Sequence, residues 1–415
     1  MAILKIRSIE HASIIGARSL TLAAKFALTA FVARFLGFSD LGLYGLLVAV
    51  STMAPIILGL GLNGVIQRDL VDMPLSGVLP HITTRFVFNI AIYLVLIPAF
   101  LIGCSLRVFQ INLVDGVLMS AIVFSEHIFN DLHAILIGRR RAAFANVLLF
   151  VRSAAWVPFY VASNLLFPQS RTFTSLLVFW TAGMVVAGVV FLPNMLRDAR
   201  WREMRIDPDW LIEGIRRSRV LYVYDLATSL TQYMDRFIIS SFLGLEATGI
   251  YVFFWSVASA INNLVYASIT QTYVPVLVGW RKQHNEAAFA AAAKRMLLES
   301  GATSIVLSVC LWVIFPIVVP YLQRPVLLSW SWGFGVVLIA TQLRLLSDAV
   351  TAIVYSRYMD ARITLWAWLS LALTGVCDLV GVTSAGLTGV IWGYLAATIG
   401  MCALRLVRSP LRQQL

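Results

Sequence analysis

RVLYVYDLATSLTQYMDRFIISSFLGLEATGIY, residues Arg219–Tyr251, is apolar enough and long enough to cross a membrane. It nevertheless contains four strongly polar side chains: Asp225, Gln232, Asp235 and Arg236. The stretch ends in FLGLEATGIY (Phe242–Tyr251), and a matching motif, FLGFSDLGLY, stands half a chain earlier at Phe35–Tyr44. A polar membrane helix that repeats a helix of the first half predicts a protein of two related lobes.

The composition is that of a membrane protein. Hydrophobic residues make up 60% of the chain and charged residues 13%, whereas soluble domains are about 45–50% apolar and about 25% charged. The net charge of +12 comes from cations between apolar segments, which indicates membrane topology and not nucleic-acid binding. The four cysteines lie in or beside apolar segments and show no CxxC spacing, so we expect neither disulfides nor a metal site.

A membrane-spanning helix needs about 20 mostly apolar residues. That rule predicts an all-α polytopic membrane protein with twelve transmembrane helices in two six-helix lobes related by an internal repeat. The predicted spans cover approximately residues 12–36, 41–67, 84–106, 112–137, 142–167, 173–196, 218–243, 247–273, 296–322, 326–355, 361–382 and 386–407.

The distribution of cations predicts the orientation. With the N-terminus inside, 23 of the 32 Lys and Arg residues fall on the inward side and 5 lie within the predicted spans. The outward side holds four: Arg34, Arg107, Arg171 and Arg324. The positive-inside rule therefore places both termini in the cytoplasm. We expect an N-terminal lobe over 1–197, a cytoplasmic linker with an interfacial helix over 198–217, and a C-terminal lobe over 218–415. In the linker, Asp207 precedes Pro208 as an N-cap precedes the first helical residue.

The two FLG motifs lie where the first span of each lobe turns into the second. Glycine at Gly37 and Gly244 allows a tight reversal of the chain there. When the halves are superposed on these motifs, Arg18 aligns with Asp225, Thr21 with Thr228, Lys25 with Gln232, and Thr29 with Arg236.

These aligned positions form one polar face on each helix, because they are three or four residues apart along it. A charge at the centre of a bilayer costs at least about 2.5–3.5 kcal/mol, so such a face normally points into a bundle or a water-filled cavity. Two interpretations stay open. The charges face a ligand, or they pair with one another and hold the lobes together, as Arg18 with Asp225, or Asp235 with Arg236 and Lys25.

Three segments resemble a known family. ARFLGFSDLGLYGLL (Ala33–Leu47) and LGLGLNGVIQRDL (Leu58–Leu70) resemble the opening of Wzx-type polysaccharide flippases. DRFIISSFLGLEATGIYVFFWSVASAINNLVYASITQTYVP (Asp235–Pro275) resembles the start of their second half. These flippases belong to the multidrug/oligosaccharidyl-lipid/polysaccharide exporter superfamily. The resemblance implies translocation of an undecaprenyl-pyrophosphate-linked oligosaccharide across the bacterial cytoplasmic (inner) membrane by alternating access, through a cavity between two lobes.

The resemblance also implies roles for the polar face. The predicted substrate-binding residues are Arg18, Lys25, Arg236, Thr21, Thr29 and Gln232, and the predicted ion-coupling or gating residues are Asp225 and Asp235. The expected partners are the undecaprenyl-pyrophosphate-linked glycan, the lipid bilayer, a coupling H⁺ or Na⁺, and other polysaccharide assembly proteins. We expect no catalytic residue and no cofactor. The glycan itself, O-antigen or exopolysaccharide among others, is not specified by the sequence.

The span over 112–137 is unusually polar. Glu126, Asn130 and His133 share one helical face, and His127 and Asp131 share another. Metal binding or acyl transfer, a proton relay or substrate contact, and hydrogen bonds between packed helices are the three interpretations.

Other features concern packing. Arg344 and Asp348 are four residues apart and predict an ion pair within a helix. Pro55 and Pro275, in equivalent spans, predict kinks.

Alternative functions remain at this point. An ion-coupled multidrug exporter of the same superfamily binds organic cations and favours carboxylates, whereas the first span supplies Arg18 and Lys25. A membrane glycan polymerase or ligase needs a larger outward loop than this sequence provides. A scaffold for a biosynthetic complex is a further non-transport interpretation, which the intramembrane charges argue against.

Overall fold

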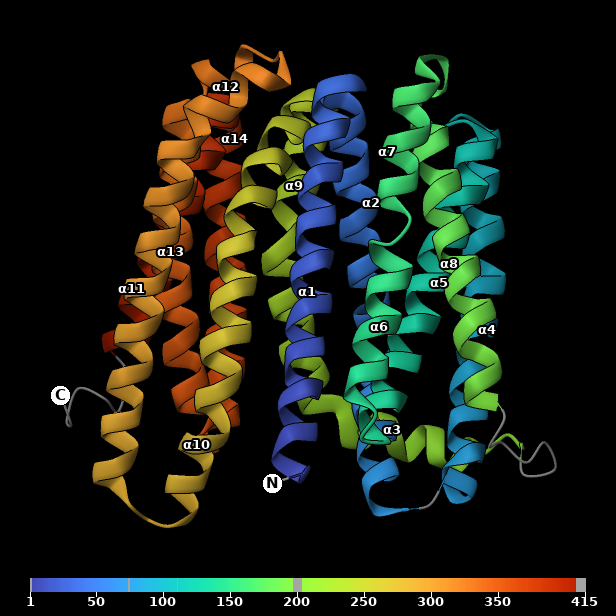
Figure 1. The fold of residues 1–415 in the computed structure, drawn as a ribbon, viewed down its shortest axis with the longest axis vertical. Helices are drawn as coiled ribbons and strands as arrows, with labels where there is room; N and C mark the ends of the chain where they lie inside the picture. The colour runs from blue at the N-terminus through green and yellow to red at the C-terminus, as the bar shows by residue number, and fades with distance from the viewer. Residues whose placement is uncertain (1, 74, 110, 197–203, 408–415) are drawn as a thin grey trace. The chain divides into compact units, whose positions relative to one another are not determined.

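The computed structural model describes residues 2–73, 75–109, 111–196 and 204–407, and every regular element within these residues is helical (Figure 1). The first part of the chain forms α1 (Ala2–Phe35), α2 (Phe38–Ile57), α3 (Leu62–Asp72), α4 (Leu75–Ser105), α5 (Leu113–Gly138), α6 (Ala142–Ser153), α7 (Val157–Leu166), η1 (Pro168–Ser170) and α8 (Phe173–Leu196). The second part forms α9 (Pro208–Val265), η3 (Tyr266–Thr270), α10 (Gln271–Lys282), α11 (Glu286–Val318), η4 (Val319–Leu322), α12 (Val326–Ser329), α13 (Ser331–Tyr355) and α14 (Asp360–Val407).

The helices account for the predicted spans. Among the described residues, nine helical segments are long and apolar enough to cross a membrane. Two of them, Pro208–Lys282 and Asp360–Leu406, are helical hairpins, because α9 is interrupted at Gly244 and α14 at Ala385 and Gly386. With each hairpin counted as two spans and α1 added, the structure contains the twelve predicted spans. The predicted fold class, an all-α polytopic membrane protein, is confirmed.

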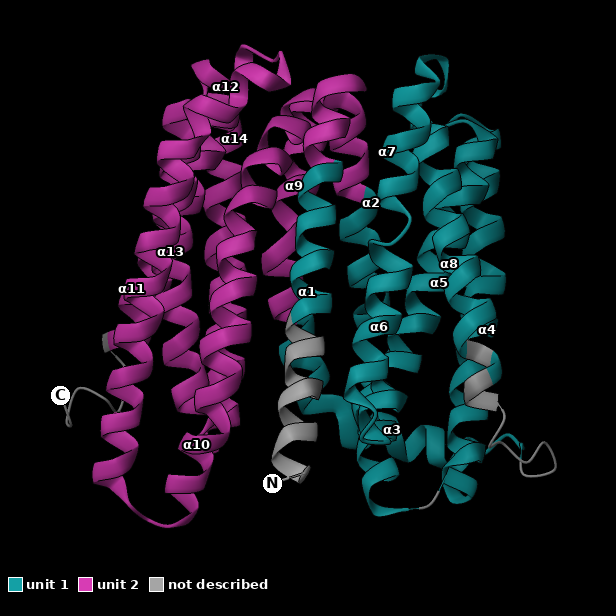
Figure 2. Ribbon diagram, in the orientation of Figure 1, with its two compact units in different colours: residues 1–28, 47–226 teal, residues 29–46, 227–415 magenta. Residues whose placement is uncertain are grey.

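The helices form two compact units (Figure 2). Unit 1 consists of Met1–Leu28 and Leu47–Leu226, and unit 2 consists of Thr29–Leu46 and Ala227–Leu415. The unit boundaries fall inside α1, α2 and α9, so each of these helices contributes to both units.

The linker helix packs on unit 1. α9 begins at Pro208, and Asp207 accepts a hydrogen bond from the Trp210 backbone amide at 2.9 Å, so the predicted N-cap is confirmed. The Trp210 indole stacks on His81 at 4.8 Å between ring centroids and donates to Asp69 Oδ2 at 2.9 Å. These contacts fix the start of α9 to α3 and α4. The earlier part of the predicted linker, including Arg200 and Arg202, lies outside the described residues.

The repeated motifs make equivalent turns. Gly37 has φ +109° and Gly244 has φ +83°, a left-handed conformation that residues with a side chain rarely adopt. The predicted reversal at both glycines is confirmed.

A second glycine of each motif has a role that the sequence did not predict. A Cβ added at Gly42 would lie 2.1 Å from the Leu245 carbonyl oxygen, and one added at Gly249 would lie 1.9 Å from the Phe38 carbonyl oxygen. The contact is reciprocal, because Gly42 occupies the same motif position as Gly249, and Phe38 the same position as Leu245. The two motifs therefore pack backbone to backbone inside unit 2, as small residues do where membrane helices approach closely.

The prolines in equivalent spans interrupt helical geometry. After Pro55, α2 ends at Ile57, and the chain passes through Leu60 and Gly61 at positive φ before α3 begins. A π-helical turn, η3, precedes Pro275. Proline removes one helical hydrogen bond, so both irregularities have a local cause.

Candidate functional site

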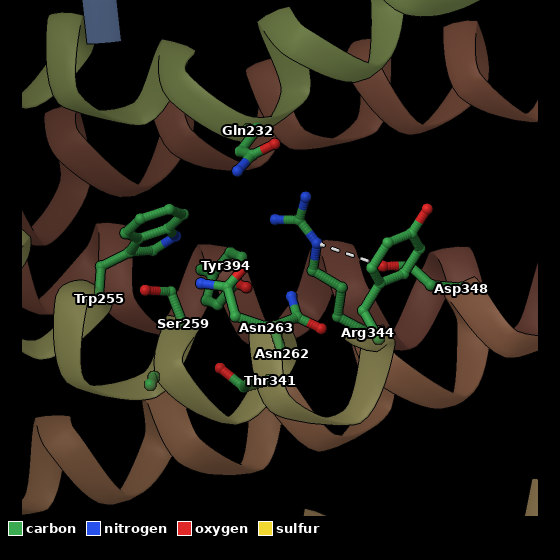
Figure 3. A pocket seen from close by; sticks show the side chains of 11 residues that line it. Gln232, Trp255, Ser259, Asn262, Asn263, Thr341, Arg344, Asp348 and Tyr394 are labelled. Atoms are coloured by element: carbon green, nitrogen blue, oxygen red, sulfur yellow. Dashed lines mark ion pairs between the residues drawn. The ribbon is translucent and has the colours of Figure 1, made fainter. Parts of the chain in front are cut away.

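Unit 2 contains a polar pocket of about 200 Å³ between the two arms of α9, α13 and α14 (Figure 3). Its lining consists of Gln232, Trp255, Ala258, Ser259, Asn262, Asn263, Tyr266, Thr341, Arg344, Asp348 and Tyr394. Figure 3 shows the side chains of Gln232, Asn263 and Arg344 directed toward one common space, with the Trp255 indole on one side of it. A pocket lined mainly by polar groups inside a membrane helix bundle marks a candidate binding site.

The pocket offers both hydrogen-bond donors and acceptors. The amides of Gln232, Asn262 and Asn263 each provide an NH₂ group and a carbonyl oxygen. The Ser259 hydroxyl donates to the Ser256 carbonyl at 2.9 Å and the Thr341 hydroxyl donates to the Val337 carbonyl at 2.8 Å. Because these two protons are engaged by backbone, the hydroxyl oxygens present lone pairs as acceptors.

The charges of the pocket compensate one another. Arg344 Nε lies 3.9 Å from Asp348 Oδ2, so the predicted ion pair within a helix is confirmed. Arg405 Nη1 donates to the other carboxylate oxygen of Asp348 at 3.2 Å. The lining itself carries one cation, Arg344, and one anion, Asp348. Its formal charge is therefore zero.

A cluster of buried charges lies behind the Trp255 side of the pocket. The Arg236 guanidinium is 1% exposed and lies between two rings, 4.1 Å from the Trp255 centroid and 4.7 Å from the Tyr233 centroid. Within the described part of the chain, its Nε has no hydrogen-bond acceptor. Asp235, also buried, accepts hydrogen bonds from the Tyr251 hydroxyl and from the Arg236 backbone amide. The Arg236 cation is thus stabilised by the two aromatic rings and lies within electrostatic range of the Asp235 carboxylate.

Asp378 on α14 differs from these groups. It is fully buried, and neither carboxylate oxygen has a hydrogen-bond donor among the residues described. Buried polar groups are nearly always hydrogen-bonded, so this carboxylate is an exception that stability does not explain.

The cations of the predicted face on α1 meet polar groups of unit 1. Arg18 Nε donates to Asn146 Oδ1 at 2.9 Å. Lys25, exposed on the surface of α1, lies within electrostatic range of Glu126 and Arg152, which form an ion pair with each other. We call Arg18, Lys25, Arg152, Glu126 and Asn146 the cationic cluster. With three cations and one anion, its formal charge is positive.

A second polar network in unit 1 is centred on Arg85, and each nitrogen of its guanidinium contacts an acceptor. Arg85, fully buried, donates to Asp131 Oδ2 at 2.8 Å from Nε and to the Gly59 carbonyl at 2.7 Å from Nη1. Its Nη2 contacts Asp131 Oδ1 at 3.1 Å and His127 Nε2 at 3.1 Å. Because arginine only donates, His127 Nε2 accepts, and the imidazole proton on Nδ1 is available to the Tyr93 hydroxyl at 3.2 Å. Of the three interpretations of the polar span over 112–137, hydrogen bonding between packed helices agrees with the contacts of His127 and Asp131.

The predicted site residues separate into three groups. Arg18 and Lys25 belong to the cationic cluster of unit 1, and Thr21 is buried there, donating to the Ala17 carbonyl at 2.8 Å. Gln232, Asp235 and Arg236 lie at the pocket of unit 2 or directly behind it. Two others stand apart: Thr29 is buried within unit 2, and Asp225 is partly buried on the section of α9 that belongs to unit 1.

Several pocket residues were not predicted. Asn262 and Asn263 are adjacent polar residues within an otherwise apolar span, so a signal was present in the sequence. Trp255, Thr341 and Tyr394 carry no such signal, because single residues of these types are common in membrane helices.

The fold has known relatives. An inward-facing multidrug resistance MATE family transporter of the MOP superfamily superposes with a TM-score of 0.76 at 14% identity, covering 95% of this chain and 94% of that one. A MATE protein in complex with MaL6 gives 0.68 at 12% identity over 97% and 96% of the two chains. A MOP superfamily transporter from Pyrococcus furiosus, described by the reverse polarity of its binding pocket, gives 0.62 at 14% identity over 97% and 94%. The protein therefore has the fold of MOP superfamily transporters and is a multi-pass membrane protein.

The sequence identifies the family. Residues 11–279, more than half of the chain, match the model of the polysaccharide biosynthesis protein family. The chain belongs to that family, which confirms the resemblance seen in the sequence. A search of curated protein sequences finds no match.

Proposed function

We propose that the protein is a flippase that moves an undecaprenyl-pyrophosphate-linked oligosaccharide across the bacterial cytoplasmic membrane by alternating access. The observation that carries the proposal is the combination of a polysaccharide biosynthesis family match with a MOP transporter fold. The family match supports a role in polysaccharide biosynthesis, and the fold supports transport across a membrane. The cytoplasmic position of both termini, the coupling to H⁺ or Na⁺ and the contact with other polysaccharide assembly proteins belong to this proposal.

The cationic cluster suits the pyrophosphate. Phosphate oxygens only accept hydrogen bonds and carry negative charge, and arginine and lysine side chains supply donors with the opposite charge. Arg18 and Lys25 lie one after the other along α1 and would hold the anionic linkage, while Asn146 orients the Arg18 guanidinium. In the proposal, Asp225 and Asp235 couple the cycle to the ion, and Arg236, Thr21, Thr29 and Gln232 complete the substrate path.

Glycan export in cells tests the assignment. In a bacterium that lacks its own flippase and produces this glycan only when one is supplied, Arg18→Ala combined with Lys25→Ala should abolish surface glycan. The protein level in the membrane should stay unchanged, because Arg18 is only partly buried and Lys25 is exposed. Exchanging the cations for one another, Arg18→Lys with Lys25→Arg, should restore part of the export. Lys282→Ala, an exposed lysine at the end of α10, is the matched control and should export normally.

A second function, ion-coupled multidrug export, is favoured by the MATE neighbours. Organic cations require a site rich in carboxylates, but the cationic cluster has the opposite sign and the pocket of unit 2 is neutral in formal charge. Drug-susceptibility measurements separate the two. If cells that express the protein become drug-resistant and their surface glycan does not change, the protein is a multidrug exporter and not a flippase. Full glycan export by the Arg18→Ala, Lys25→Ala variant would show that these two residues do not bind the pyrophosphate.

A further inference from the structure

We propose that the pocket of unit 2 binds a sugar residue of the transported head group and does not bind the pyrophosphate. This inference rests on the proposed function, since it assigns part of the same cargo to a particular place. It concerns Asn262, Asn263 and the residues around them, which the predicted polar face did not include.

The hydrogen-bonding capacity of the lining matches hydroxyl groups. A sugar hydroxyl is both a donor and an acceptor, and so is each carboxamide at Gln232, Asn262 and Asn263. All three carboxamides line the pocket, and none of them is fully buried. The lone pairs of Ser259 and Thr341 add acceptors, because the protons of both hydroxyls are already given to backbone carbonyls. A ligand that carries several hydroxyl or acetamido groups satisfies this set.

The electrostatics of the lining disfavour a pyrophosphate. The one lining cation, Arg344, has Asp348 within 3.9 Å, and Asp348 also lines the pocket. Among the side chains that line the pocket, a diphosphate beside Asp348 would meet a carboxylate and no excess of cations, and like charges repel strongly where water is scarce. Arg405 lies outside the lining and is buried, and its Nη1 already donates to Asp348. Arg236 offers no accessible donor to the pocket, because its guanidinium lies between the Trp255 and Tyr233 rings and is 1% exposed. Its charge is opposed by the neighbouring Asp235 carboxylate.

The size and the aromatic walls of the pocket also suit a sugar ring. The volume of about 200 Å³ is below the roughly 300–1,000 Å³ that drug-sized ligands occupy. Trp255 and Tyr394 supply flat apolar area with a polar edge, which suits the mixed apolar and hydroxyl surface of a sugar ring. One ring, and not the extended oligosaccharide, fits this space.

Binding measurements on the purified full-length protein in detergent test the inference. The probes are undecaprenyl pyrophosphate without sugar, undecaprenyl-pyrophosphate-linked N-acetylglucosamine, and the corresponding galactose lipid. At least one sugar-bearing probe should bind the unaltered protein about tenfold more tightly than the bare lipid diphosphate, equivalent to about 1.4 kcal/mol. Asn262→Ala combined with Asn263→Ala should remove this advantage and leave the affinity for the bare lipid unchanged, which also shows that the variant is folded. Gln283→Ala, an exposed amide outside the pocket, should keep the advantage.

The outcomes distinguish this inference from the proposed function. If all three probes bind the unaltered protein equally well, the sugar pocket is wrong while lipid diphosphate binding stands. If the double variant weakens all three probes alike, the pocket does not discriminate sugar and the inference is likewise overturned. If none of the probes binds, the proposed function fails, and the inference fails with it.

Discussion

Unit 1 and unit 2 each contain a fully buried charged side chain, Arg85 and Asp378, and the two differ in their hydrogen-bond partners. In unit 1, the Arg85 guanidinium is fully buried, and each of its three nitrogens contacts an acceptor on Asp131, His127 or Gly59. In unit 2, the described surroundings of Asp378 offer its carboxylate no hydrogen-bond donor, and Arg236 lies between aromatic rings. Charge that is fully paired holds helices together, whereas charge that is not paired adds no such support.

The difference extends to what holds each unit. Arg85 joins α4 to α5 and to the irregular turn after α2. In unit 2, backbones meet directly at glycines, as at Gly42 and Gly249, and again where a Cβ at Gly389 would lie 2.0 Å from the Gly381 carbonyl oxygen. Close glycine packing needs no polar side chain. The amides that line the pocket of unit 2 take no part in these glycine contacts.

Neutralising Asp131 should produce the largest effect. Asp131→Asn removes the anion that two Arg85 nitrogens and the Asn89 amide contact, and leaves Arg85 buried without its counter-ion. Breaking a buried ion pair from one side costs about 3–5 kcal/mol. We expect a large fall in the thermal unfolding temperature of the purified protein. Glu213→Gln, which breaks the exposed pair with Arg216, is the control and should change the stability by about 0–1 kcal/mol. If the two variants lower the stability equally, the buried pair of Arg85 with Asp131 contributes no more than an exposed surface pair.

A methyl group at the glycine contact should have the next largest effect. Gly249→Ala places a Cβ 1.9 Å from the Phe38 carbonyl oxygen, so the helices must separate. Overpacking of this kind costs about 1–3 kcal/mol. Gly279→Ala is the matched control, because a Cβ there meets nothing within 4 Å, and alanine favours the helix. A Gly249→Ala protein that unfolds at the same temperature as the control would show that unit 2 does not depend on this contact.

The smallest effect should have the opposite sign. Asp378→Asn removes a buried carboxylate that lacks a hydrogen-bond donor among the described residues, and an unsatisfied buried polar group costs about 1–3 kcal/mol. Part of that cost should be recovered, so we expect a modest rise in the unfolding temperature, in contrast to Asp131→Asn. We also expect slower transport in proteoliposomes, since a group that lowers stability is typically kept for function. A fall in stability would mean that Asp378 has a structural role comparable to that of Asp131.

Local sequence rules were sufficient for the spans and for several contacts. Apolar length located the twelve helices, the FLG motifs located the left-handed glycines Gly37 and Gly244, and a spacing of four residues gave the pair of Arg344 with Asp348. Each of these features depends on residues that are close in the chain.

The pocket and the buried network depend on which helices become neighbours. Arg85 and Asp131 stand on different helices, and neither position specifies the other. Asn262 is visibly polar within its span, but its place beside Thr341 and Tyr394 follows from the packing of α9, α13 and α14. The same limitation applies to Gly42, whose contact with Leu245 requires the second half of the chain.

Movement of a lipid-linked sugar between leaflets tests the proposed function most directly. The purified protein would be reconstituted into liposomes that contain fluorescent undecaprenyl-pyrophosphate-linked N-acetylglucosamine and galactose lipids, and the fraction of each in the outer leaflet would be followed over time. The protein should accelerate the exchange of at least one of these lipids far above that of protein-free liposomes, and Arg18→Ala with Lys25→Ala should abolish the acceleration. Exchange at the protein-free rate for every lipid, with correctly folded protein in the membrane, would contradict the flippase.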